Sequence, residues 1–407
     1  MENDSRKRSA QRVLLLMATK NNAYLNYHRD CFEQRFDGFY CLVLADTLRE
    51  SGVKRTQSRI MEIIEREGIN LVIVMPFALN FEISVEFYAS LKSRAHLVFW
   101  FFDDETYFDA HSKYYAQAAD AVVTTDLLAV SAYQKLGMTA ISYFSSYSKD
   151  DYFPSNVKKD IDVSFVGNVA KQDRRAFLEF LSKEGIRVES YGNETPNGPI
   201  SMDRMREVFS RSKINLNFTK IDPWTSVCGD DPLLARARSN KGRPIEIALT
   251  RSFCLSEYTP TLNQLFVIGR EIDVFHSRND LLEKVRHYLA HPDAGEKIAA
   301  SAYQRAIAEY ESETYFSAIF NQIDSMINRS GHERNNVPIL LSRAFETKAV
   351  RGLTILFFVQ VRHGRFLPAF DVMLEALKYR PLAVIQGMYL GTIRMFLDIL
   401  HRVNPWG

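Results

Sequence analysis

The sequence predicts an α/β protein with two successive units, each built on a parallel sheet, and a helical C-terminal extension. Short, uniformly apolar runs alternate with amphipathic helical segments over the first 150 residues. The same alternation restarts at Asp160, after a polar stretch that contains Pro154. Apolar strands separated by helices are typical of a parallel sheet covered on both faces.

Strands are predicted where β-branched and aromatic residues cluster, and helices where apolar residues recur every three or four positions. In the first unit the predicted strands are 13–17, 71–75, 97–102 and 121–125, and the helices are 27–35, 56–67, 81–92 and 127–136. In the second unit the predicted strands are 162–166, 187–191, 214–218 and 253–256, and the helices are 173–184, 202–212, 244–250, 280–290, 293–310 and 314–328. A long loop, 219–242, interrupts this order, and a loop of that length inside a compact domain is usually functional or mobile.

Length and composition agree with this organisation. The chain has 407 residues, 46% of them hydrophobic and 25% charged, which excludes disordered and fibrous classes. A chain of this length rarely folds around a single hydrophobic core, so we predict three domains, at 1–155, 156–330 and 331–407. The net charge of +2 gives no indication of a nucleic-acid partner. From residue 337 onward, however, the sequence has nine basic and only four acidic residues. We expect this basic extension to contact the main body, a partner or a membrane surface.

Cysteine usage and hydropathy indicate a cytoplasmic protein. The four cysteines, Cys31, Cys41, Cys228 and Cys254, form no CxxC pair, so neither a zinc site nor any other metal site is expected. The first apolar run is only six residues long, too short for a secretory signal. No run is long enough to span a membrane, so any membrane contact is expected to be peripheral, at the inner face of the cytoplasmic membrane.

The segment Lys241-Gly242-Arg243-Pro244-Ile245-Glu246 carries the clearest chemistry. Pro244 suits the first position of a helix, where its missing N–H has no cost. Lys241 and Arg243 place two cations at that end, and Gly242 permits close approach to the backbone. Glu246, one turn in, can accept hydrogen bonds from a ribose diol. The pattern predicts a diphosphate site, and its structural alternative is a capped surface helix with solvated charges.

An ordered set of motifs resembles one family of glycosyltransferases. The motifs are Asp162-Val-Ser-Phe-Val-Gly167, Tyr191-Gly192, Ile214-Asn-Leu-Asn-Phe218, Arg243-x-x-Glu246, Leu255-Ser-Glu257 and Gly269-x-Glu271. Together they resemble the CgeB-type, spore-maturation-protein-like family, which has the GT-B fold of two Rossmann-like domains facing a cleft. The resemblance covers roughly residues 97–325 and is strongest over 160–310.

This resemblance implies a bacterial glycosyltransferase that moves a hexosyl or related sugar from a nucleotide-diphosphate donor to a glycan, lipid-linked or other cell-surface acceptor. It implies no cofactor beyond the donor and no metal. Glu246 would bind the ribose, and Lys241 and Arg243 the diphosphate. Gly167 and Asn168 would line the cleft, Tyr191 and Gly192 would lie near the base, and Glu257 would complete the donor-binding set.

In the first domain, the apolar run 97–102 ends at Asp103-Asp104-Glu105. Carboxylates at the carboxyl end of a parallel strand face the ligand crevice, so Asp103 or Asp104 is a candidate base for the acceptor hydroxyl. His28 is a third candidate, because it lies just beyond the loop that follows the first strand. The structural alternatives are a helix N-cap with first-turn acids, and a core histidine.

Two other functions stay open at this point. The retaining GT-B pattern has a second glutamate eight residues before the ribose glutamate, and that position is Arg238 here. This departure leaves the stereochemistry open and admits a non-catalytic glycan-binding or assembly protein that keeps the fold. A metal-dependent GT-A-like transferase, with Asp103-Asp104-Glu105 as metal ligands, is a third possibility, which the second complete α/β unit disfavours.

Overall fold

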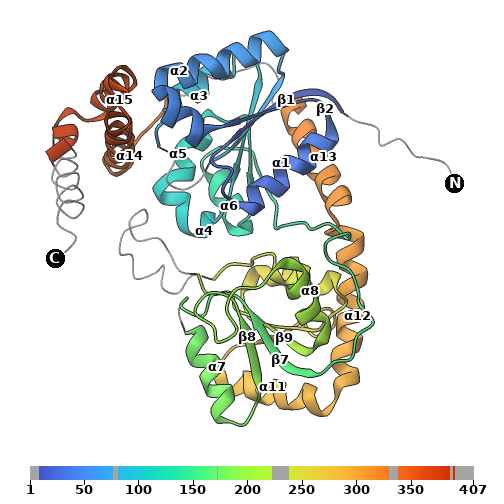
Figure 1. The fold of residues 1–407 in the computed structure, drawn as a ribbon. Coiled ribbons are helices and arrows are strands. Elements are labelled where there is room, and N and C mark those ends of the chain that lie inside the picture. Colours follow the sequence, from blue (N-terminus) through green and yellow to red (C-terminus); the bar gives the residue numbers. More distant parts are fainter. Residues whose placement is uncertain are drawn as a thin grey trace. The chain divides into compact units, whose positions relative to one another are not determined.

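The computed structural model describes residues 9–76, 81–171, 173–221, 238–329, 338–385 and 388–389. Contacts within the chain divide it into two compact units. The first comprises Met1–Thr124, Val130–Ile141 and Ser325–Gly407, and the second comprises Thr125–Ala129 and Ser142–Asp324. The C-terminal helices are therefore grouped with the first unit (Figure 1).

The first unit is built on a six-stranded sheet in the order β2-β1-β3-β4-β5-β6. Its strands are β1 (Ser9–Met17), β2 (Phe36–Val43), β3 (Leu71–Met75), β4 (His96–Phe101), β5 (Ala121–Thr124) and β6 (Ala140–Ser142). The pairs from β2 through β5 are parallel. Every residue of β3 and β5 is buried, as expected for strands covered on both faces.

The helices of this unit are α1 (Ala23–Arg35), α2 (Leu44–Glu67), α3 (Val85–Leu91), α4 (Asp104–Tyr107), α5 (Lys113–Tyr115) and α6 (Leu127–Lys135). Two of them start earlier than the sequence indicates. Asn22 caps α1 by accepting the amide of Leu25, and α2 begins at Leu44 and continues through Gly52, where the chain kinks at a φ of 77°. A glycine tolerates that dihedral, so two helical segments are joined there.

The second unit holds a five-stranded, all-parallel sheet in the order β11-β10-β9-β7-β8. Its strands are β7 (Ile161–Val166), β8 (Val188–Tyr191), β9 (Ser212–Asn217), β10 (Cys254–Glu257) and β11 (Asp273–Phe275). The helices are α7 (Arg174–Lys183), α8 (Met202–Arg211), α10 (Arg243–Leu249), α11 (Arg278–Ala290), α12 (Pro292–Glu309) and α13 (Ser312–Arg329). Two apolar clusters pack against this sheet, one with α8 and α10 and the other with α7 and α11.

The C-terminal extension forms a helical hairpin, α14 (Arg343–Arg362) and α15 (Phe366–Tyr379), that packs on α2. Gln360 is fully buried and donates to the carbonyls of Leu48 and Arg49, each at 2.7 Å. Phe345 packs its ring against Tyr114, with centroids 4.5 Å apart. The extension therefore contributes to the core of the first unit. This agrees with the expectation that it contacts the main body.

Among the described residues, no helix is long and apolar enough to cross a membrane.

Candidate functional site

The carboxyl ends of the strands in the second sheet gather most of the residues expected to bind a donor. Since the strands are parallel, their carboxyl ends lie along one edge. The residues at this edge are Gly167 and Asn168 after β7, Tyr191 and Gly192 at the end of β8, Thr219 after β9, and Glu257 at the end of β10. The helix α10 connects β9 to β10, which are adjacent and parallel, so it runs back across the sheet and begins at this same edge. The edge of the sheet and the start of α10 together form the candidate site.

Glu246 lies in α10 and is only 8% exposed. One carboxylate oxygen, Oε2, accepts a hydrogen bond from Nη1 of Arg243, and the other, Oε1, accepts one from the hydroxyl of Tyr152 at 3.3 Å. Burial, and then the negative charge of Glu246, raise the pKa of Tyr152, so its hydroxyl stays protonated and remains a donor. A carboxylate has about four lone-pair positions, so Glu246 keeps acceptor capacity for a bound diol.

Arg243 is held in place by contacts from α8. Its guanidinium carbon lies 5.4 Å from the ring centroid of Phe209, and Nη1 lies 2.7 Å from Sδ of Met205. The side chain is one-quarter exposed, so these contacts leave part of it open to solvent. Arginine has five N–H donors in a planar fork, which suits it to phosphate oxygens. The sequence motif did not indicate Tyr152, Met205 or Phe209, which lie far from it along the chain.

The residues before Arg243 are placed close to an aromatic side chain. Gly242 is the N-cap of α10, and a Cβ added there would lie 1.9 Å from the hydroxyl oxygen of Tyr147. Glycine therefore allows Tyr147 to approach the backbone at this position. Lys241 is exposed beside it. Burial raises the pKa of Asp126, and the positive charge of Lys241 partly opposes this shift.

Glu257 has a different environment from Glu246. Its Oε2 accepts the backbone amides of Thr219, at 2.9 Å, and of Lys220, at 3.1 Å. Its Oε1 is paired with Arg238 at 3.1 Å. Glu257 thus fixes both described ends of the segment between β9 and α10. The role expected for it in donor binding stays a prediction, and the contacts show a structural role in addition.

The turns after β7 and β8 contact each other through their backbones. The amide of Gly167 donates to the carbonyl of Tyr191 at 2.8 Å, and the side chain of Asn168 accepts the amide of Ala170 at 2.8 Å. Gly192 has a φ of 120°, and a Cβ there would lie 2.3 Å from the carbonyl oxygen of Gly167. Only glycine fits so close an approach at that dihedral.

The three candidate bases of the first unit differ in exposure. Asp103 is exposed at the end of β4, with a left-handed φ of 59°, and its side chain makes no capping hydrogen bond to α4. Asp104 is 3% exposed and accepts from Thr124 at 2.7 Å and from Tyr133 at 2.8 Å. His28 is fully buried, where desolvation lowers its pKa to about 4, and its Nδ1 lies 2.8 Å from the carbonyl of Tyr24. The burial of Asp104 and His28 favours the structural alternatives for these two residues.

Within the described part of the chain, no group of three or more His, Cys, Asp or Glu side chains is arranged to hold a metal ion.

Comparisons with known proteins agree with this architecture. Residues 171–321 match the family model described as "Glycosyl transferase-like". Sucrose-phosphate synthase from Thermosynechococcus elongatus superposes with a TM-score of 0.55 at 9% identity, over 78% of this chain and 100% of that one. Anabaena HepE, in complex with UDP and glucose, gives 0.56 at 10% identity, with 78% and 100% covered. A glycosyltransferase from Rickettsia africae gives 0.57 at 10% identity, with 78% and 99% covered. No curated protein sequence matches significantly.

The expected fold is therefore confirmed: two parallel sheets flanked by helices, as in GT-B glycosyltransferases, with a helical C-terminal end. The match to the glycosyltransferase-like model spans α10, β10 and the edge residues Tyr191 and Gly192. It does not extend to the first unit up to residue 124 or to the C-terminal hairpin.

Replacing Gly192 with alanine should destabilise the second unit, because the new Cβ would overlap the Gly167 carbonyl. Gly185→Ala is the matched control, since Gly185 also has a positive φ, of 80°, but open space around it. We expect Gly192→Ala to lose about 1–3 kcal/mol more unfolding free energy than Gly185→Ala, measured by urea denaturation. Equal losses for the two variants would show that the backbone contact at this edge is unimportant.

Proposed function

We propose that the protein is a glycosyltransferase of the CgeB type, which transfers a hexosyl or related sugar from a nucleotide-diphosphate donor to a glycan, lipid-linked or other cell-surface acceptor. One observation carries the proposal: Arg243 is hydrogen-bonded to the buried Glu246 where α10 begins, at the carboxyl edge of a parallel sheet. Ligands of open α/β sheets bind at this edge. The glycosyltransferase-like match includes the pair, and HepE, which shares the fold, holds UDP and glucose.

In this proposal Glu246 accepts hydrogen bonds from the ribose hydroxyls, with the oxygen positions that Arg243 and Tyr152 leave unused. Lys241 precedes α10 and Arg243 is its first residue, so both cations lie at the start of the same helix. Together they neutralise the diphosphate, and no metal ion takes part. Gly167 and Asn168 line the donor pocket, and Tyr191 and Gly192 lie near the base. Glu257 contributes by holding Thr219 and Lys220 in place at the same edge.

For the acceptor, we propose Asp103 as the base. A general base has to come within hydrogen-bond distance of the proton that it removes. Asp103 is exposed, whereas Asp104 and His28 are buried. Asp104, through its bonds to Thr124 and Tyr133, positions the turn on which Asp103 lies.

Glu246→Ala should weaken donor binding by about 1–3 kcal/mol, the range for hydrogen bonds to a charged group. A thermal-shift screen of UDP-, GDP-, ADP- and dTDP-sugars first selects the donor, since a ligand that binds the native state raises the melting temperature. Calorimetry then compares the variant with Glu179→Ala, which removes an exposed glutamate of α7. Equal donor affinity in the two variants would contradict the assignment. Donor binding without any transfer would favour a glycan-binding protein that keeps the fold.

Arg243→Ala should weaken binding of the nucleoside diphosphate by about tenfold or more while leaving the nucleoside nearly unaffected, because the guanidinium acts on phosphate charge. The measurement is calorimetry with UDP and uridine, or with the pair that matches the selected base. Arg270→Ala removes an exposed arginine of the same unit and serves as the charge control. Equal losses for the diphosphate and the nucleoside would assign Arg243 a purely structural role.

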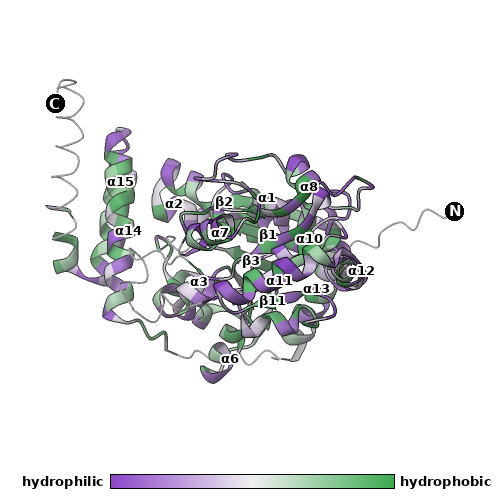
Figure 2. Cartoon of the chain, turned by 90° about the horizontal axis from the view of Figure 1, so that it is seen from below, coloured by the Kyte–Doolittle hydropathy of each residue, from purple (hydrophilic) through white to green (hydrophobic). Residues whose placement is uncertain are grey.

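We also propose that the C-terminal hairpin contacts an anionic membrane at the cytoplasmic face. One face of α15 packs inward through Ala369, Val372 and Ala376. The opposite face exposes Phe366, Leu367 and Phe370, which are 69%, 75% and 52% accessible, and Figure 2 shows hydrophobic residues along this helix. The basic residues Arg365, Lys378 and Arg380 lie at the two ends of this helix. Exposed apolar side chains beside basic ones are typical of a helix that lies at a membrane surface.

The triple change Phe366→Ser, Leu367→Ser and Phe370→Ser should abolish flotation with vesicles that contain anionic lipid, while donor binding is retained. Leu128→Ser is the matched control, because Leu128 is 62% exposed on α6. Neutral vesicles and high salt should reduce flotation of the wild type, since salt screens the basic residues. Flotation of the triple variant at the wild-type level would exclude this face as the contact.

A further inference from the structure

The second unit contains a cavity at the end of its sheet opposite to the candidate donor site. Its volume is about 590 Å³, within the range of roughly 300–1,000 Å³ typical of small-molecule sites. Its walls come from the segment before β7, the start of β9, the connection between α10 and β10, and α12. These are the amino ends of the strands, so the cavity is separate from the carboxyl edge where Arg243 and Glu246 lie.

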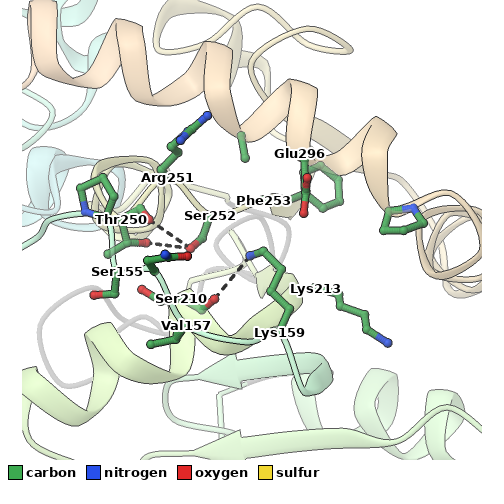
Figure 3. A pocket seen from close by; sticks show the side chains of 14 residues that line it. Ser155, Val157, Lys159, Ser210, Lys213, Thr250, Arg251, Ser252, Phe253 and Glu296 are labelled. Carbon is green, nitrogen blue, oxygen red and sulfur yellow. Dashed lines mark hydrogen bonds between the residues drawn. The ribbon is translucent and has the colours of Figure 1, made fainter.

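Cations and hydroxyl groups dominate the polar part of this cavity (Figure 3). The cations are Lys159, Lys213 and Arg251, the lone acid is Glu296, and the hydroxyls belong to Ser155, Ser210, Thr250 and Ser252. Lys213 is neutralised by Asp162 at 2.6 Å, whereas Lys159 and Arg251 form no ion pair with a described residue. Phe253 and Pro292 supply an apolar wall.

Lys159 is the best-placed cation for a ligand. Its ammonium donates to the carbonyls of Ser212, at 3.1 Å, and of Ser210, at 3.4 Å, at the end of α8. An ammonium has three donors, so one remains for a ligand. Burial lowers the pKa of Lys159, while the charge of Glu296 raises it. An anion bound beside the ammonium would offset the desolvation of its charge.

Ser210 supplies a second, independent indication. Its side chain is 4% exposed, lines the cavity, and has no hydrogen-bond partner for its hydroxyl in the described structure. By contrast, the hydroxyls of Thr250 and Ser252 are bonded to each other at 3.0 Å. A buried hydroxyl without a partner is uncommon and needs an explanation, such as a ligand that supplies the missing bond.

We propose that this cavity binds a small organic anion, a phosphate monoester or a carboxylate, whose charged group is held by Lys159 and Ser210. Arg251, exposed at the edge of the cavity, attracts the anion, and the apolar wall at Phe253 contacts its carbon skeleton. This anion is a second ligand, bound in addition to the donor, because the cavity lies at the amino edge of the sheet and the donor site at the carboxyl edge. The site does not depend on the proposed transferase activity.

Inorganic phosphate and glycerol 3-phosphate are the first probes, with citrate as the carboxylate and sodium chloride as the ionic-strength control. We expect the anions to raise the melting temperature of the wild type, and Lys159→Met to weaken their binding by about tenfold or more in calorimetry. Lys158→Met is the matched control, because Lys158 is the neighbouring exposed lysine and does not line the cavity. It should bind like the wild type.

Ser210→Ala keeps the proposal testable if Lys159→Met does not fold, because it removes only the hydroxyl and leaves the contacts of Lys159 intact. It should weaken anion binding several-fold without lowering the melting temperature of the free protein. Arg243→Ala separates this cavity from the candidate donor site: it removes any phosphate binding at the donor site and should leave the binding that depends on Lys159 and Ser210. Anion binding that is lost in Arg243→Ala but kept in Lys159→Met and Ser210→Ala would overturn the proposal, as would no binding of any anion to the wild type.

Discussion

The hydrogen bonds of two buried asparagines in β9 hold the central strand of the second sheet between its neighbours. Asn215 accepts from Ser164 of β7 at 2.9 Å and donates to the carbonyls of Phe209 and Phe253, each at 3.2 Å. Asn217 donates to Ser256 of β10 at 2.8 Å. Buried polar groups of this kind are costly unless all are satisfied, so they disfavour any shift of register. Both ends of the sheet, and hence both candidate sites, depend on this alignment.

Much of the fold could be predicted from the sequence because the inner strands are either apolar throughout or alternate between apolar and polar residues. The run that became β3 is entirely apolar, and those that became β7 and β9 alternate. The strand β2 was missed, since Gly38 interrupts it and only Phe36 and Leu42 are buried, so its pattern of apolar residues has no clear period. The strand β11 has only three residues, Asp273–Phe275, too few to establish a period at all.

The candidate donor site was predictable only where its residues are close in sequence. Arg243 and Glu246 lie three positions apart and form one motif, with Pro244 marking the start of the helix. Tyr152, by contrast, reaches Glu246 from 94 positions away, and no local pattern can indicate such a contact. The burial of Asp104 likewise could not be predicted from the local sequence, because it depends on contacts with Thr124 in β5 and Tyr133 in α6.

The short helix α10 joins the two candidate sites of the second unit. It begins with Arg243, and its C-cap, Thr250, lines the cavity at the opposite end. The helix α8 makes a second connection, because Phe209 packs on Arg243 while the next residue, Ser210, lines the same cavity. Well-packed helices transmit displacement more readily than they deform. An anion beside Ser210 would change donor affinity only if it favoured one position of these helices over another, and the donor would then change anion affinity by the same factor.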